Sequence, residues 1–217
     1  MTVVHLPRPL VESREAAAAR LAYAVQRPGG VAVLCGPPGT GVSTVLELLA
    51  TAPAGGSYQP AVRPLRDWND DADDAPLPGV VLADDAHTCN GTMIRRLVDR
   101  CRRQRSASSL VLAGHGRLLS LIARDATLER SVLLRAVLRP FSLSETRRVL
   151  EAMLARPETP RLTDDAARAI HELAAGIPAT VVRLAELAGV ISASRPDGSL
   201  SARDIEAIHH RLCVRAA

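Results

Sequence analysis

Short apolar runs alternate with amphipathic stretches over the first 140 residues of the chain. Runs at 31–34, 80–83, 109–113 and 132–138 are bounded by glycine or polar residues, which is typical of buried strands. Helices are expected beside them, at 12–25, 43–50, 93–104 and 117–123. This alternation predicts an α/β fold, with a parallel sheet covered by helices on both faces.

The pattern changes after Arg139 and Pro140. Helical stretches follow one another at 144–155, 163–174, 179–193 and 201–212, separated by glycine- and proline-containing breaks. We therefore expect two domains. An α/β base spans residues 1–140, and a small all-helical domain spans residues 141–217.

The segment 62–78 fits neither pattern, because it is polar, contains proline and is rich in aspartate. Its carboxylates belong to Asp67, Asp70, Asp71, Asp73 and Asp74. They resemble a metal cluster, but their spacing is irregular. We interpret the segment as an exposed, solvated loop.

The strand at 31–34 leads directly into a glycine-rich loop. The loop matches the phosphate-binding pattern G-x-x-x-x-G-K-[ST] at all positions but one, and consists of Gly36, Pro37, Pro38, Gly39, Thr40, Gly41, Val42, Ser43 and Thr44. Such a loop surrounds phosphates with backbone N–H groups, its lysine reaches the β- and γ-phosphates, and its hydroxyl binds Mg²⁺. Here Val42 takes the lysine position, so the cradle and the Ser43 hydroxyl are present without the cation.

Two carboxylates, Asp84 and Asp85, follow the strand at 80–83. In nucleotide hydrolases with such a loop, a strand-end aspartate holds the Mg²⁺ that the loop hydroxyl also binds. Asp84 fits this role together with Ser43. The next residue usually polarises the attacking water. Asp85 is in this position, but it is shorter than the usual glutamate, which withdraws the carboxylate by about 1.5 Å.

Composition adds one unusual fact: all 27 residues counted as lysine or arginine are arginine. A bias toward arginine does not explain Val42, because it would convert lysine into arginine. The net charge of +4 permits nucleic-acid binding without requiring it.

The four cysteines are scattered, and neither a signal peptide nor an apolar run of about 18 residues occurs. We expect reduced thiols in a cytoplasmic protein without a membrane span.

Three further motifs complete a family pattern. The strand at 109–113 leads into Gly114 and His115, Arg130 precedes a strand that ends in Arg-Pro-Phe-Ser at 139–142, and Gly-Ile-Pro-Ala occupies 176–179. With the loop and the Asp-Asp-Ala-His strand end at 84–87, the chain resembles the AAA+ ATPases, and within them the bacterial ExeA- and TniB-like group. That group assists secretion assembly or DNA transposition.

The resemblance implies a P-loop NTPase fold, with a three-layer parallel-sheet base and a C-terminal helical lid. It implies ATP or ADP with Mg²⁺ as ligands, and assembly into homo- or hetero-oligomers. It gives His115 a sensor position at a strand end, where a hydrogen-bonded structural histidine is the alternative. It makes Arg130 a candidate arginine finger, which would contact the nucleotide of a neighbouring subunit. Arg135 and Arg139 are alternative candidates for this role.

Three positions depart from the family pattern. The loop lysine is Val42, the catalytic glutamate is Asp85, and the γ-phosphate-sensing arginine after Gly-x-Pro is Ala179. All three residues would contact the γ-phosphate or its attacking water. Their joint change indicates weak or absent hydrolysis.

The helix expected at 93–104 carries a run of arginines: Arg95, Arg96, Arg100, Arg102 and Arg103. The run is consistent with a solvated helix face, or with contacts to duplex DNA or an acidic protein partner. The chain has only four aromatic residues, so stacking on single strands fits poorly. His87 is consistent with a surface histidine or a proton relay.

Three functional hypotheses follow. The first is a nucleotide-binding regulatory or adaptor subunit with little turnover. The second is an active ATPase in which an arginine replaces the loop lysine and Asp85 serves. The third is a non-enzymatic scaffold that binds DNA or protein through its arginine-rich helix.

Overall fold

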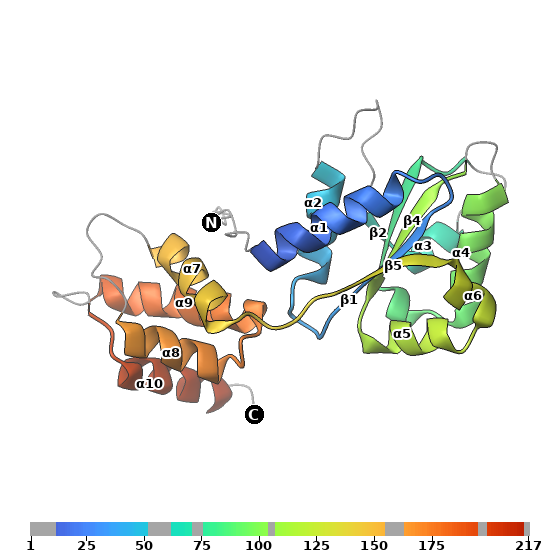
Figure 1. Cartoon of the computed structure of the whole chain (residues 1–217). Helices are drawn as coiled ribbons and strands as arrows, with labels where there is room; N and C mark the ends of the chain where they lie inside the picture. The colour runs from blue at the N-terminus through green and yellow to red at the C-terminus, as the bar shows by residue number, and fades with distance from the viewer. Residues whose placement is uncertain are drawn as a thin grey trace. The chain divides into compact units, whose positions relative to one another are not determined.

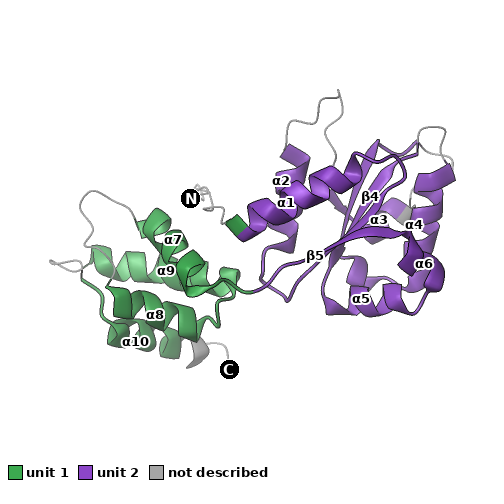
Figure 2. Ribbon diagram, viewed as in Figure 1, with its two compact units in different colours: residues 1–12, 140–217 green, residues 13–139 purple. Residues whose placement is uncertain are grey.

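The computed structural model describes residues 12–51, 62–70, 76–103, 107–154, 163–194 and 199–214. The chain divides into two compact units, coloured separately in Figure 2. One is residues 13–139, called here the sheet unit. The other groups residues 140–217 with residues 1–12, and is called here the helical unit.

A five-stranded parallel sheet forms the centre of the sheet unit (Figure 1), in the order β2-β3-β4-β1-β5. The strands are β1 Val31–Cys35, β2 Val62–Pro64, β3 Val80–Asp84, β4 Ser109–Gly114 and β5 Val132–Val137. Every pairing is parallel, with Cys35 of β1 opposite Gly114 of β4. The carboxyl ends of all strands therefore meet at one edge.

Helices cover both faces of the sheet, as predicted. α1 Glu12–Val25 and α2 Val42–Thr51 pack on one face, and α3 Leu65–Asp70, α4 Gly91–Arg103, α5 Gly116–Ala123 and α6 Ala126–Ser131 pack on the other. Val31 and Val33 of β1 face the α4 side, whereas Ala32 and Leu34 face the α1 side. Burial on both faces explains why the central strands read as continuous apolar runs.

The interpretation of 62–78 as an exposed loop is wrong for its first part. Val62–Pro64 forms β2, and Leu65–Asp70 forms α3. Leu65 and Trp68 are buried, and Nε1 of Trp68 donates a hydrogen bond to the Leu82 carbonyl at 3.4 Å. A three-residue strand and a six-residue helix are too short to show a period. Asp71, Asp73 and Asp74 lie outside the described residues.

Another short element, α6, was not predicted from the sequence. Asp125 caps it by accepting hydrogen bonds from the backbone nitrogens of Thr127 at 3.0 Å and Leu128 at 3.3 Å. Aspartate before a short polar segment is a recognised helix start, but six residues carry too little pattern to identify a helix.

The helical unit contains four helices: α7 Leu143–Leu154, α8 Asp164–Leu173, α9 Pro178–Ala193 and α10 Ala202–Val214. Each lies within two residues of its predicted bounds. Their shared core includes Ile170, Val181 and Ile205, which are fully buried. Ser201 and Asp204 form a reciprocal cap, in which the Ser201 nitrogen donates to Asp204 at 2.9 Å and the Asp204 nitrogen donates to Ser201 at 3.4 Å.

The described cysteines Cys35, Cys89 and Cys101 are buried and free. Burial raises the pKa of the Cys101 thiol to about 12, and it also raises the pKa of Cys35. Both thiols are therefore poor nucleophiles. Within the described part of the chain, every helix is too short or too polar to cross a bilayer.

Trp68→Ala is expected to destabilise the protein by about 3–5 kcal/mol, because it empties a buried indole site between α3 and the sheet. Urea unfolding followed by circular dichroism measures the change. Arg66→Ala is the matched control on the same helix, with a side chain that is 70% exposed. It should change stability by no more than about 0.5 kcal/mol. Equal effects of the two substitutions would contradict the placement of α3.

Candidate nucleotide-binding site

The glycine-rich loop joins β1 to α2 in a tight turn. Gly39 and Gly41 have φ values of +79° and +89°, which glycine adopts without steric cost. The buried Thr40 closes the turn, because its backbone nitrogen and its Oγ1 both donate to the Pro37 carbonyl, at 3.2 and 2.7 Å. The loop is thus shaped by its own backbone and by one internal hydroxyl.

The start of α2 supplies free backbone donors beside this turn. The first intrahelical bond runs from the Val45 nitrogen to the Gly41 carbonyl at 3.1 Å. The N–H groups of Val42, Ser43 and Thr44 therefore have no acceptor in their own helix. Together with the helix dipole, these donors suit a phosphate group.

The side chain of Val42 belongs to the core, although its backbone N–H is one of these donors. Its side chain is only 5% exposed and packs in the cluster that includes Leu21 of α1 and Leu46 of α2. The position that carries a cation in lysine-bearing loops is here an apolar packing position.

Ser43 and Asp84 form the candidate magnesium pair. Ser43 Oγ donates to Oδ2 of Asp84 at 2.7 Å, and the other carboxylate oxygen, Oδ1, accepts from the Asp85 nitrogen at 2.8 Å. A hydroxyl and a carboxylate oxygen are ligands that Mg²⁺ prefers, so the two residues fit this ion. The pair forms because β1 and β3 end at the same edge of the sheet.

Asp85 begins the short 3₁₀ helix η1 Ala86–Thr88, with its backbone in the left-handed region at φ +51°. Its carbonyl accepts from the nitrogen and the hydroxyl of Thr88, at 2.9 and 2.8 Å. The Asp85 side chain is exposed and makes no cap hydrogen bond. The backbone is therefore fixed while the carboxylate is left to solvent.

His115 connects the end of β4 to the loop. Its Nδ1 lies 3.0 Å from the Gly36 carbonyl, and because a carbonyl only accepts, Nδ1 carries the proton in this contact. The Nε2 of the neutral ring is then an acceptor. The His87 ring lies 4.4 Å from the His115 ring, between centroids, and its Nδ1 is buried without a partner among the described residues. The structure thus brings His115, His87 and Gly36 together.

Arg14 is a contact that the sequence reasoning missed. This arginine of α1 is 4% exposed, and its Nη2 donates to the carbonyls of Thr40, at 2.9 Å, and Arg139, at 2.8 Å. The available signal was periodicity, since Arg14 shares a helical stripe with the buried residues Ala17 and Leu21.

Other predicted residues lie apart from these contacts. Arg130 is exposed on α6, where its Nε donates to the Ala126 carbonyl of the same helix at 3.0 Å. Ala179 is exposed on α9 of the helical unit. The catalytic and sensor roles assigned to these positions stay predictions.

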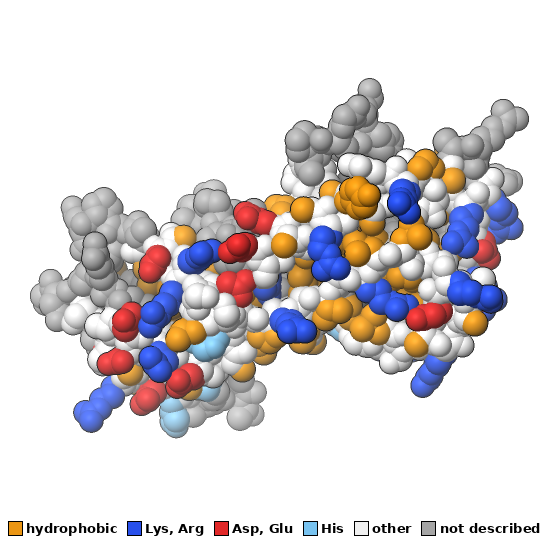
Figure 3. Space-filling model, in the orientation of Figure 1, with side chains coloured by type: hydrophobic (Ala, Val, Ile, Leu, Met, Phe, Trp, Pro, Cys, Tyr) orange, Lys and Arg blue, Asp and Glu red, His pale blue; other side chains and the backbone are white. Residues whose placement is uncertain are grey.

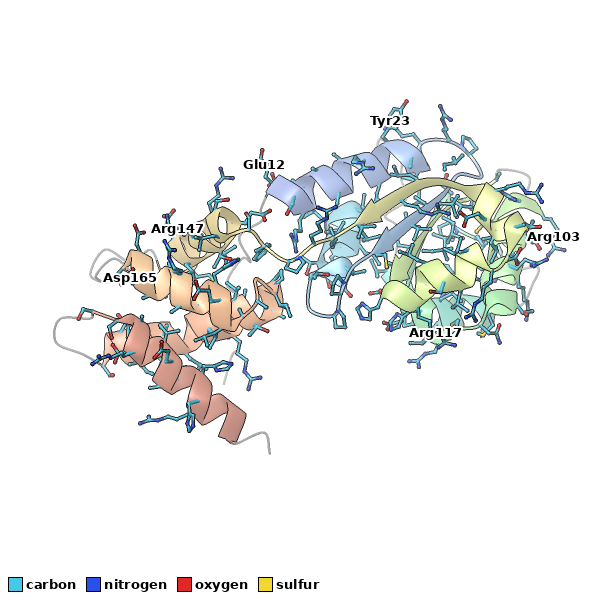
Figure 4. The ribbon with its side chains drawn as sticks, turned by 60° about the horizontal axis from the view of Figure 1, so that its bottom comes forward. Glu12, Tyr23, Arg103, Arg117, Arg147 and Asp165 are labelled. Atoms are coloured by element: carbon cyan, nitrogen blue, oxygen red, sulfur yellow. The ribbon has the colours of Figure 1, made fainter. Side chains whose placement is uncertain are left out.

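The arginine-rich helix α4 is less uniform than its sequence indicated. Arg100 is buried, and its Nη1 donates to the Trp68 carbonyl at 2.8 Å, so it does not belong to an exposed DNA-binding face. Arg95 pairs with Asp125. Burial acts to raise the pKa of Asp125, but its backbone hydrogen bonds and Arg95 outweigh burial and lower it. Arg102 and Arg103 are exposed, and Figure 4 shows Arg103 directed outward.

Comparison with known proteins gives matches in structure alone. No family model matches the chain, and no curated protein matches it in sequence. The Aeropyrum pernix ORC1 protein in complex with DNA aligns at a TM-score of 0.71 and 17% identity, over 97% of this chain and 68% of that one. The ORC2 protein of the same organism, in ADPNP-ADP complexes, aligns at 0.68 and 14% identity, over 96% and 70%. The Thermotoga maritima RuvB Holliday junction branch migration motor aligns at 0.65 and 16% identity, over 91% and 70%.

These neighbours are AAA+ ATPases, and the match extends over both units. The chain has the AAA+ fold. This confirms the fold predicted from the loop, the strand-end aspartates and the helical C-terminal part. In this AAA+ fold, the loop 36–44 follows β1, Asp84 ends β3 and His115 follows β4, so the candidate residues come from three strands of one sheet.

Gly36→Ala is expected to lower stability by about 1–3 kcal/mol, because a Cβ there would meet Thr40 Oγ1 at 2.5 Å and Leu138 Cβ at 3.0 Å. Thermal and urea unfolding measure the loss. Gly116→Ala is the control, since a Cβ at Gly116 would meet no atom within 4 Å. The control should be neutral or slightly stabilising. A neutral Gly36→Ala would show that the loop is more open than described.

Proposed function

We propose that this protein binds ATP or ADP with Mg²⁺ through the loop 36–44, and hydrolyses ATP slowly or not at all. The observation that carries the proposal is the Ser43–Asp84 hydrogen bond at 2.7 Å beside a loop whose lysine position is buried in the core. The groups for phosphate and magnesium are present, and the group for the γ-phosphate is replaced.

Binding rests on two kinds of contact. The first-turn N–H groups of Val42, Ser43 and Thr44 would bind the phosphates, and Ser43 and Asp84 would hold Mg²⁺. The lost lysine removes one charge-assisted contact of about 1.5–3 kcal/mol, so affinity is about ten- to hundred-fold below that of a complete loop.

Slow turnover follows from the groups around the γ-phosphate. Asp85 is too short to hold the attacking water as a glutamate would, and its backbone is fixed in a left-handed turn. The Nδ1–H of His115 is already used by the Gly36 carbonyl, at 3.0 Å. Ala179 supplies no charge. Magnesium, where bound, withdraws electron density from the β- and γ-phosphate oxygens.

A protein that keeps nucleotide and turns it over poorly suits a regulatory or adaptor subunit. We place it in a secretion- or DNA-associated complex, beside an active partner. The resemblance to the ExeA- and TniB-like group supports this role, as do structural neighbours described as a DNA complex and a branch migration motor. The exposed Arg130 is the proposed contact to a neighbouring subunit's nucleotide.

The two other hypotheses have less support. An active ATPase needs a replacement cation, and Arg14 is the arginine that bonds to the loop. Its Nη2 donates to the carbonyls of Thr40 and Arg139, so it maintains the shape of the loop. A scaffold that binds DNA through α4 has fewer arginines available for phosphate contacts, because Arg100 is buried and Arg95 forms an ion pair with Asp125.

Isothermal calorimetry with ATP or ADP and Mg²⁺ tests the binding proposal. Wild-type protein should bind, and Ser43→Ala should weaken binding by about ten-fold or more, through loss of a magnesium ligand. Thr51→Ala removes a hydroxyl at the other end of α2, where Oγ1 bonds to the carbonyls of Glu47 and Leu48, and should change nothing. No heat at millimolar nucleotide would refute the proposal.

Val42→Lys is expected to tighten nucleotide binding about ten- to hundred-fold. The aliphatic part of lysine fills the valine site while its ammonium extends to the loop. Val42→Met is the control of similar length without charge, and should leave affinity unchanged. Turnover should stay low in both variants, because Asp85 and Ala179 are intact. Equal affinity of the lysine and methionine variants would show that the side chain at position 42 does not contact the phosphates.

A further inference from the structure

The side of the sheet unit formed by α1 and β5 has a groove that the proposed nucleotide chemistry does not use. Its volume is about 510 Å³, and it is lined by Ala19, Arg20, Tyr23, Ala24, Arg27, Leu133 and Leu134. Figure 3 shows hydrophobic side chains gathered over α1 and β5, with basic side chains at their margins.

The backbone beside this groove is available for pairing. β5 is an edge strand, and the Leu138 nitrogen just beyond it donates toward β1, to the Cys35 carbonyl at 2.7 Å. Alternate residues of a strand direct their backbone groups to opposite sides, so Arg135 and Val137 direct theirs to the open edge. Leu133 lies where the register with β1 shifts, so the alternation does not extend to it. The direction of the Arg135 carbonyl is consistent with this pattern, because Nη2 of Arg20 on α1 donates a hydrogen bond to it at 3.5 Å.

Large apolar side chains are exposed on both elements, Tyr23 on α1 and Leu133 and Val137 on β5. Tyr23 is 68% exposed, Leu133 is 55% exposed and Val137 is 56% exposed. Figure 4 shows Tyr23 directed away from α1 into solvent. Exposed apolar groups gathered at a sheet edge are typical of a surface that binds another chain.

The charge of the groove indicates the chemistry of the chain that would bind there. Among the residues that the structure describes, two arginines and no carboxylate line the groove. Among the described residues, neither Arg20 nor Arg27 forms an ion pair, whereas the neighbouring Arg135 is neutralised by Glu129 at 2.7 Å. Arg20 lies on α1, and Arg27 lies in the turn that follows this helix. They provide two positive positions beside β5.

We propose that an extended, acidic segment of a partner protein binds here as a sixth strand beside β5. Its backbone pairs with the edge-facing groups of Arg135 and Val137, its apolar side chains cover Tyr23 and Leu133, and its carboxylates bind Arg20 and Arg27. The long bond from Arg20 to the Arg135 carbonyl is replaced by a strand N–H, which frees the guanidinium for a carboxylate.

A second copy of this chain fits the edge less well. Two copies that paired through β5 by a two-fold axis would bring the same arginines, Arg20 and Arg27, close to their counterparts. Like charges facing each other oppose such an interface. An acidic partner removes this conflict. The groove between α1 and β5 is separate from the loop 36–44, so binding of an acidic segment there does not depend on nucleotide binding.

Selection from a random twelve-residue peptide phage library, against the full chain without nucleotide, tests the proposal. The enriched peptides should be acidic with alternating apolar residues. A fluorescein-labelled synthetic peptide of the most enriched sequence is then titrated by anisotropy. The double variant Arg20→Glu with Arg27→Glu should weaken its binding at least ten-fold, and so should Leu133→Glu.

The control is Arg117→Glu with Arg124→Glu, which makes the same change of charge at two exposed arginines of the sheet unit outside the groove. This variant should bind the peptide as wild type does. Enrichment of neutral or basic peptides would overturn the proposal, as would equal losses in the two double variants. Self-association in sedimentation that disappears in Leu133→Glu would assign the edge to a second copy instead.

Discussion

The parallel direction of all five strands is the constraint on which the candidate site depends. Since every strand ends at one edge of the sheet, the residues that follow β1, β3 and β4 meet although they are far apart in sequence. The hydrogen bonds from Ser43 to Asp84 and from His115 to Gly36 are direct results. Burial of both sheet faces then fixes the strands, so the geometry of this edge follows from the core.

The loop is supported from two sides by groups of different character. From the core side, Val42 packs among aliphatic side chains of α1 and α2. From α1, Arg14 binds the Thr40 carbonyl through a buried guanidinium. The cradle thus keeps the shape of a phosphate loop while its strongest charged contact is gone. In the proposed function, this combination would separate nucleotide binding from hydrolysis, since binding depends mainly on backbone donors and hydrolysis depends on charged side chains placed at the γ-phosphate.

Sequence reasoning predicted the features that have a long period or a fixed spacing. The sheet, the helices on both faces, the four C-terminal helices and the meeting of Ser43 with Asp84 all follow from such patterns. It failed where the signal was short or came from tertiary packing. The elements β2, α3 and α6 have only three to six residues each. An exposed Arg100 was expected because arginine usually is exposed, and only the fold shows that its Nη1 donates to a backbone carbonyl of α3. Arg14 was missed for the same reason.

The two carbonyls held by Arg14 have a thermodynamic consequence. A conformer that moves Thr40 away from Arg139 breaks one of the two hydrogen bonds that Nη2 of Arg14 donates, at a cost of about 1–3 kcal/mol. Open forms of the loop are therefore about 5- to 150-fold rarer than they would be without this hydrogen bond. A ligand that enters a cradle already in its bound shape loses little entropy in ordering it. For the proposed nucleotide, preorganisation by Arg14 would offset part of the contact that a lysine at position 42 would supply.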